Sequence, residues 1–215
     1  MSERKKVRKI AFWSVLFLIC SLTVYMLGEH SLHARIAFRE AERKNLTGPA
    51  EIVEILDFED SRYDHLLIGK SEYGYSFYEW QDNDRIKYDA NFSYQPKGER
   101  ATLYCTEYDY ESLYTGRAWL PIFAFTEDYT AVSAHLTLTI DRPDGITTYD
   151  LETNRTPEDY FLFQLKIEDL GSQDFWMIQQ LITGAHGEHI LDGTASAELC
   201  LYDRNGVLIE TISFT

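Results

Sequence analysis

The stretch Ala131–Glu152, "AVSAHLTLTIDRPDGITTYDLE", decides the fold class of this chain. Up to Ile140, apolar and polar residues alternate. The apolar positions are Val132, Ala134, Leu136, Leu138 and Ile140. Because successive side chains of a strand point to opposite faces, this period of two predicts a strand with one buried face. Pro143, Asp144 and Gly145 then favour a turn, so we expect a second, antiparallel strand to follow.

The same period recurs along most of the chain after Pro49. It is found in "RIKYDANFSY" (85–94) and "YFLFQLKI" (160–167), and "LYDRNGVLIET" (201–211) is typical of a hairpin that turns at Asn205 and Gly206. We count roughly five strands before residue 107 and roughly seven after residue 120. The segment "DFWMIQQLIT" (174–183) fits either a strand or a helical turn. The pattern predicts an all-β domain of antiparallel sheets, sandwich-like, with two β subdomains at 49–117 and 118–215. The second is similar to immunoglobulin-like sandwiches in strand number and length only, because their Cys…Trp…Cys core spacing is missing.

The N-terminal part has a different character. The run Ile10–Gly28 holds 19 residues without a charge. As a helix it would be roughly 28 Å long, close to the ~30 Å hydrocarbon core of a bilayer. Residues 1–9 carry a net charge of +4. The positive-inside rule then predicts a single-pass signal anchor in the cell membrane, with residues 1–9 cytoplasmic and residues 29–215 outside. The lipid bilayer is the partner expected for residues 10–28.

A cleaved signal peptide is the competing interpretation. Its apolar region would be shorter, and it would end in a small-x-small site. Here Met26 stands two residues before Gly28, and Ile19 stands before Cys20 where lipoprotein processing needs a small residue. We therefore favour an uncleaved anchor. His30–Lys44 favours a helix that ends before Gly48 and Pro49, so residues 29–48 are expected to form a helical stalk.

The charge balance limits the classes of partner. The whole chain carries −15 and the first nine residues +4, so the remainder carries −19. An acidic surface without a basic stripe repels phosphates, which argues against a nucleic-acid partner and against flat binding to anionic lipid.

The segment "HLLIGKSEYGYSFYEW" (65–80) is rich in aromatic residues on both faces of a predicted strand. One interpretation is that the second face packs under a neighbouring element at the subdomain junction, since aromatic residues dominate cores. The other is a surface for a protein or glycan ligand, where exposed Tyr and Trp are common anchors. The candidate ligand-binding residues are Tyr75, Tyr78, Trp80, Tyr108 and Tyr110.

Metal and cysteine chemistry give weaker signals. His186, Glu188 and His189 could bind a divalent cation, but they lie in a Gly-rich loop without the spacing of helical zinc sites. No other cofactor is predicted.

Cys105 and Cys200 fall in the part expected outside the cell, where a disulfide can form. However, strand alternation places Cys105 beside Leu103, whereas Cys200 points away from Leu199.

No catalytic constellation stands out in the sequence. The leading expectation is therefore a membrane-anchored, non-catalytic binding or accessory module outside the cytoplasm. The alternative is a surface-anchored hydrolase or metal-dependent enzyme that uses the loop of His186, Glu188 and His189 or scattered carboxylates. Asn45, Asn91 and Asn154 match the glycosylation acceptor pattern.

Overall fold

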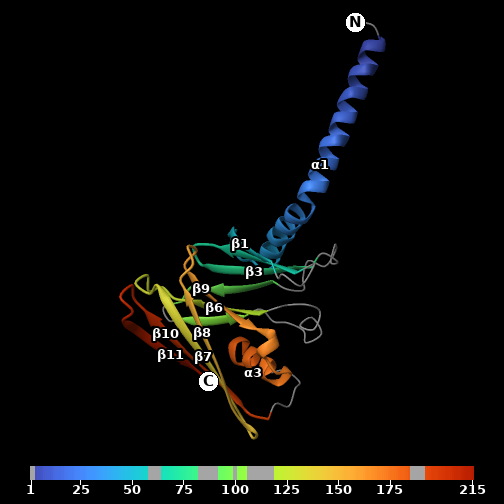
Figure 1. The fold of residues 1–215 in the computed structure, drawn as a ribbon. Coiled ribbons are helices and arrows are strands. Elements are labelled where there is room, and N and C mark those ends of the chain that lie inside the picture. Colours follow the sequence, from blue (N-terminus) through green and yellow to red (C-terminus); the bar gives the residue numbers. More distant parts are fainter. Residues whose placement is uncertain (1–2, 58–63, 82–91, 99–100, 106–118, 185–191) are drawn as a thin grey trace.

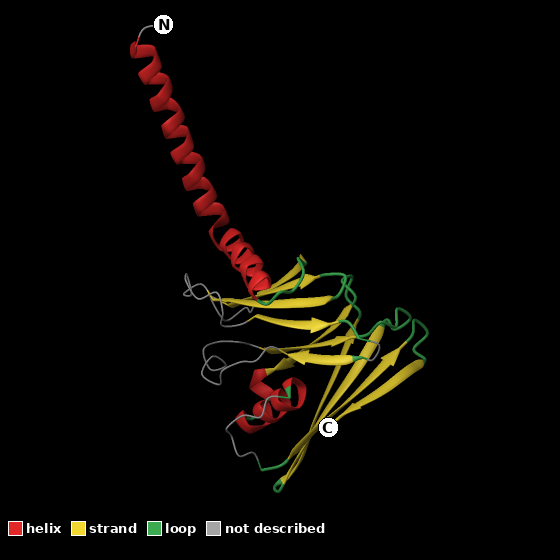
Figure 2. Cartoon of the chain, turned by 180° about the vertical axis from the view of Figure 1, so that it is seen from behind, coloured by secondary structure: helices red, strands yellow, loops and turns green. Residues whose placement is uncertain are grey.

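A computed structural model of the chain describes residues 3–57, 64–81, 92–98, 101–105, 119–184 and 192–215. A long helix, α1 (Glu3–Lys44), leads into three antiparallel sheets (Figures 1 and 2). The first sheet has the order β1-β2-β3-β4, with β1 (Glu51–Asp57), β2 (Asp64–Lys70), β3 (Gly74–Gln81) and β4 (Phe92–Pro96). The middle sheet has the order β5-β6-β9, with β5 (Thr102–Cys105), β6 (Trp119–Phe125) and β9 (Tyr160–Lys166). The third sheet has the order β11-β10-β7-β8, with β7 (Ser133–Arg142), β8 (Gly145–Asn154), β10 (Thr194–Tyr202) and β11 (Leu208–Phe214). A short 3₁₀ helix, η1 (Ile167–Asp169), and a helix, α3 (Ser172–Thr183), connect β9 to β10.

The third sheet confirms the antiparallel prediction. β7 and β8 form a hairpin in which Leu138 lies opposite Tyr149, and β10 and β11 form a second hairpin around the turn that contains Gly206. The inward face of β7 is buried at Ala134, Leu136, Leu138 and Ile140. The period of two therefore gave both the strand and its buried face correctly.

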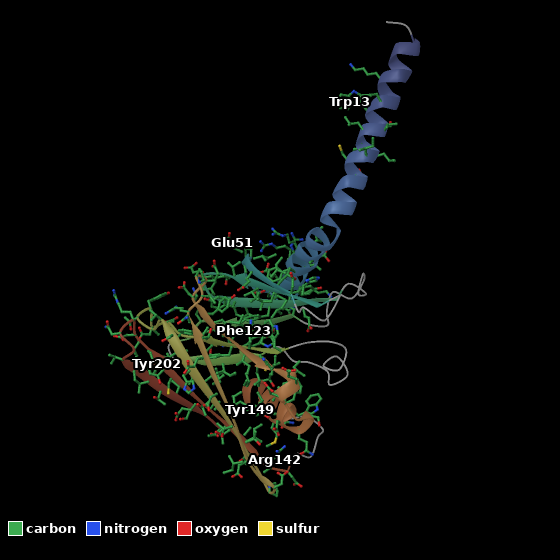
Figure 3. The ribbon with its side chains drawn as sticks, in the orientation of Figure 1. Trp13, Glu51, Phe123, Arg142, Tyr149 and Tyr202 are labelled. Carbon is green, nitrogen blue, oxygen red and sulfur yellow. The ribbon has the colours of Figure 1, made fainter. Side chains whose placement is uncertain are left out.

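The middle sheet is buried on both faces. One face, which includes Ile122 and Phe163, packs against the third sheet and α3. The other face packs against Leu66, Ile68 and Phe77 of the first sheet, and its centre is Phe123 (Figure 3). β6 has the sequence "WLPIFAF", and such a continuous apolar run is typical of a strand that is covered on both sides.

The pairing of β5 concerns the predicted boundary between the two β subdomains. It pairs with β6, so that Cys105 lies opposite Ile122. A boundary at residue 117 would thus separate β5 from the sheet to which it belongs. The predicted junction, residues 108–118, lies outside the described residues.

The segment 174–183, which fits two structures in the sequence, is helical. α3 buries Phe175, Met177 and Ile178 against the core of the third sheet. It ends at Gly184, whose left-handed backbone (φ 67°) lets its N–H donate to the carbonyl of Gln180.

The helix expected at 30–44 is confirmed as the last part of α1. Its apolar face packs on the outer face of the first sheet through Ala34, Ala37, Phe38 and Ala41. The spacing of three and four residues places these side chains on one side of a helix. The segment is therefore docked on the domain and is not a free stalk. The earlier part of α1, which carries Trp13, extends away from the sheets (Figure 3). Among the described residues, no helix is both long and apolar enough to span a bilayer.

Candidate functional site

The predicted aromatic surface is buried where the structure describes it. Tyr75 and Tyr78 are each 3% exposed. Tyr75 packs on Phe125 of the middle sheet, with ring centroids 4.6 Å apart, whereas Tyr78 points to the other side and meets Phe38 of α1. Neither residue offers an exposed surface to a ligand in this structure, because each face of β3 has a covering layer. The side chain of Trp80, and Tyr108 and Tyr110, lie outside the described residues.

The structure contains no disulfide between Cys105 and Cys200, a pairing that the sequence left open. Cys105 is buried between the middle and third sheets. Cys200 lies on the outward face of β10, where its sulfur is 3.6 Å from Oγ1 of Thr211. The third sheet thus separates the two sulfurs.

The predicted cation site cannot be placed. His186, Glu188 and His189 lie outside the described residues, so this site stays a prediction. Among the residues that are described, no three His, Cys, Asp or Glu side chains gather in a way that could hold a metal ion.

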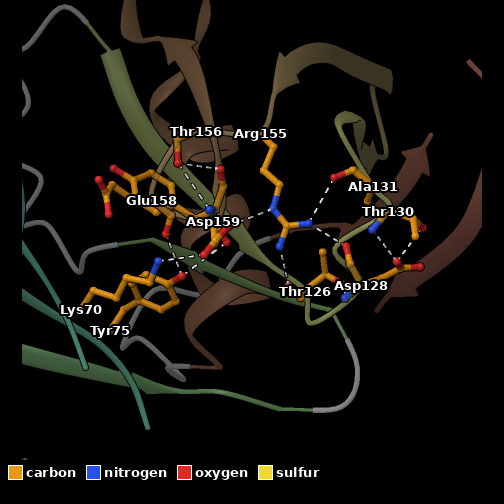
Figure 4. A network of polar contacts seen from close by, with 11 residues as sticks. Lys70, Tyr75, Thr126, Asp128, Thr130, Ala131, Arg155, Thr156, Glu158 and Asp159 are labelled. Carbon is orange, nitrogen blue, oxygen red and sulfur yellow. Dashed lines mark hydrogen bonds and ion pairs between the residues drawn. The ribbon is translucent and has the colours of Figure 1, made fainter. Parts of the chain in front are cut away.

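A dense polar cluster surrounds Arg155, just after β8 (Figure 4). Its guanidinium donates hydrogen bonds to the carbonyls of Asp128 (2.6 Å), Ala131 (3.1 Å) and Thr126 (3.2 Å). The side chain is only 10% exposed. Arg155 therefore holds the loop between β6 and β7 in place.

The same cluster ties the turn between β8 and β9 to the first sheet. Nζ of Lys70 lies 2.8 Å from a carboxylate oxygen of Asp159, and the Tyr75 hydroxyl donates to the carbonyl of Glu158 (3.0 Å). Burial, and then the charge of Asp159, raises the pKa of Tyr75 far above its usual value, so this hydroxyl stays protonated and keeps donating. The void beside these residues measures about 30 Å³, enough for a single water. Because the charges are matched internally, we assign the cluster a structural role.

A larger groove lies between α1 and β1. Its volume is about 480 Å³, and its lining consists of Arg35, Ile36, Arg39, Glu40, Arg43, Glu51 and Ile52. Three arginines spaced by four residues project from one face of α1. They outnumber the two acids of the lining. Because Arg39 is paired with Glu42, the remaining charged groups of the lining are two arginines and two acids.

One arginine of the groove also holds the helix to the sheet. Arg39 donates to the carbonyl of Ala50 and to Glu42 (2.9 Å), and the N–H of Ala50 donates to the other oxygen of Glu42 (2.7 Å). The Glu42 side chain is 3% exposed and has its charge paired. Arg39 and Glu42 therefore form a clamp on the backbone that precedes β1.

The other two arginines differ from Arg39. Arg35 and Arg43 are exposed, and they make no side-chain hydrogen bond or ion pair with any described residue. Guanidinium groups bind carboxylates and phosphates through paired hydrogen bonds. The groove consequently offers two free cationic groups on either side of a clamped one.

The sequence contained a signal for this groove, namely arginine at every fourth position of "RIAFREAER" (35–43). Sequence reasoning missed it because the segment was interpreted as a stalk. No family model, no curated protein and no solved structure matches this chain.

Proposed function

We propose that this chain is a membrane-anchored, extracytoplasmic binding or accessory module that acts without catalysis. The groove between α1 and β1 holds the anionic groups of its ligand. The observation that carries the proposal is a groove of about 480 Å³ in which Arg35 and Arg43 make no ion pair or side-chain hydrogen bond with a described residue. The residues of the alternative, an enzyme built on the His186 loop, lie outside the described part of the chain.

The character of α1 supports an anchor. Residues 10–28 carry no charge and follow a tail of net charge +4. Phe12, Trp13 and Phe17 are 63, 58 and 75% exposed on this part of the helix. Such apolar side chains are costly in water and favourable in lipid, and a helix satisfies its own backbone there. By the positive-inside rule, the tail lies in the cytoplasm, residues 10–28 lie in the cell membrane and residues 29–215 lie outside the cell.

The clamp connects the anchor to the binding groove. α1 runs without interruption from the uncharged segment to Lys44, and its last turns are docked on the first sheet. Arg35 follows Gly28 by seven residues, which corresponds to roughly 10 Å of helix. The groove therefore opens near the membrane surface at a constant orientation, which suits a protein that presents a ligand to a membrane-bound neighbour.

The spacing of the two free arginines restricts the ligand. Eight residues separate Arg35 from Arg43, which places their Cα atoms roughly 12 Å apart along the helix. A ligand that engages both needs two anionic groups at a similar separation. An acidic extended peptide has this geometry, because side chains four residues apart lie on one face of a strand at a separation of roughly 13 Å.

The test is a titration of the full-length chain, in a non-ionic detergent, with a hexaglutamate peptide. We expect the affinity to fall at least tenfold when Arg35 and Arg43 are both replaced by glutamine, about 1.4 kcal/mol or more for the pair. Arg204→Gln, in the exposed turn between β10 and β11, is the matched control and should bind as the wild type does. Equal binding by the double variant, or no binding by the wild type, would reject the groove as the site. The anchor has its own test, which is retention in the membrane fraction after alkaline extraction.

A further inference from the structure

The outer edge of β11 has the properties of an unused pairing surface. β11 is the first strand in the order of the third sheet, and among the described elements it pairs with β10 alone (Figure 1). A strand in this position exposes one row of backbone N–H and C=O groups that can pair with another strand.

Other edge strands of the described sheets carry features that discourage pairing. β1 lies beside α1, has a bulge after Ile52 and bears three acids, which are Glu51, Glu54 and Asp57. β4 ends in Pro96, and β5 is only four residues long. β8 carries two acids, Asp150 and Glu152, and is followed at once by a bridge between Arg155 and Phe161 of β9. Charge, proline, short length and coverage are the usual protections of an edge.

β11 lacks these protections over most of its length. Its sequence, "LIETISF", contains one charge, Glu210, and no proline. Its only irregularity is a bulge near its start, between Glu210 and Leu208. Seven residues without further interruption are sufficient for a regular ladder with a neighbouring strand.

The side chains of β11 leave the margin of the core uncovered. Ile209, Ile212 and Phe214 pack against the core of the third sheet but are only partly buried. Val207 and Leu208, at the start of the strand, are 59% and 51% exposed. An additional strand would pair with the backbone and also cover these apolar groups, so both contributions favour the same partner geometry.

We infer that β11 pairs antiparallel with β11 of a second copy of this chain, which joins the two third sheets into one continuous sheet. A two-fold axis needs only this one surface, because an isologous contact is self-complementary. If the axis passes at the central residue, Thr211, then Glu210 faces Ile212 of the second copy. The single acid of the strand therefore does not oppose itself. A partner recruited by charge would find only that one carboxylate on β11.

The charge of the chain gives this contact a distinct salt dependence. Two copies of −19 beyond residue 9 repel each other at long range. Backbone hydrogen bonds and apolar contact are short-ranged and are not weakened by salt. Association should consequently strengthen as added salt screens the repulsion, which is the reverse of an electrostatically driven complex.

Cysteine cross-linking of the full-length chain in a non-ionic detergent tests the register. Thr211→Cys is made together with Cys20→Ser and Cys200→Ser, since the Cys200 sulfur lies 3.6 Å from the Thr211 hydroxyl and would compete within one copy. Residues that face each other in an antiparallel pair have the Cα separation that a disulfide requires. Under mild oxidation we expect the mass to double from 25.1 kDa. Thr148→Cys in the same background, an exposed position on β8, is the control and should form no covalent dimer.

Light scattering without cross-linking supplies the second measurement. The wild type should show a dimer whose share rises with salt, and Thr211→Lys should yield folded monomers with the circular dichroism spectrum of the wild type. A monomeric wild type at every salt concentration, a dimer that survives Thr211→Lys, or equal cross-linking at residues 148 and 211 would each overturn the inference. These results are independent of the alkaline extraction and of the peptide titration, so the proposed function can fail while this contact stands, and the reverse.

Discussion

Replacing Phe38 by alanine removes the side chain that docks α1 on the first sheet. Phe38 is fully buried, with its ring 6.3 Å, centroid to centroid, from each of the rings of Tyr78 and Phe92. It lies over Gly69, where a Cβ atom would come within 2.4 Å of the Phe38 ring. Phe→Ala changes in cores cost roughly 3–5 kcal/mol. Because a helix on the outside of a sheet can shift to fill part of the space, we expect about 3 kcal/mol.

The assay is urea and thermal unfolding of the full chain in a non-ionic detergent, followed by circular dichroism. A loss of about 3 kcal/mol corresponds to a fall of roughly 6–12 °C in the unfolding temperature for a domain of this size. Ile36→Ala is the matched control, since Ile36 is 48% exposed two residues away on the same helix, and its effect should stay within about 0.5 kcal/mol. If Phe38→Ala is no more destabilising than Ile36→Ala, α1 is not docked as described.

Three further changes test the packing and the buried polar groups. Gly69→Ala should lower the free energy of unfolding by roughly 1–3 kcal/mol in the same urea assay, because its Cβ would lie 2.4 Å from the Phe38 ring. In a double variant, Phe38→Ala should relieve much of the cost of Gly69→Ala. Asp174→Ala should cost roughly 3 kcal/mol by urea unfolding, since it leaves Arg142, whose Nη1 is 2.6 Å away, without its buried partner. Burial and the hydrogen bond to Asp174 raise the pKa of Tyr149 above its unfolded value of 10.0, so the stability that its protonation contributes is complete below pH 10 and is lost at higher pH. Between pH 9 and 11, the urea concentration at the unfolding midpoint should accordingly fall less steeply for Tyr149→Phe than for the wild type.

The part of the fold that sequence predicted is the part set by neighbouring residues. The alternation in β7 and the turn at Gly145 specify a hairpin by themselves, and the structure has that hairpin with Leu138 opposite Tyr149. The stacking of three sheets could not be read in the same way. The apolar run of β6 indicates burial on both faces, but only the tertiary structure shows that the first and third sheets provide the two covers.

The aromatic strand β3 shows the same limit at the level of a site. Tyr75 and Tyr78 alternate to opposite faces, so the sequence required a second covering layer or an exposed surface and could not decide between them. The structure supplies the layer from α1, a segment that sequence reasoning had placed apart from the sheets as a stalk. The same misplacement hid the groove, since arginines on a free stalk have no facing strand.

The clamp explains why Arg35 and Arg43, and not Arg39, are suitable probes of binding. Arg39 donates to the Ala50 carbonyl and pairs with the buried carboxylate of Glu42, so its removal leaves that charge without a described cation and weakens the attachment of α1. Loss of ligand affinity in an Arg39 variant would therefore mix two effects. Arg35 and Arg43 hold nothing in place among the described residues, and their replacement changes the groove's charge while the clamp stays intact. A fall in affinity at constant unfolding temperature would hence assign the anionic ligand to the groove itself.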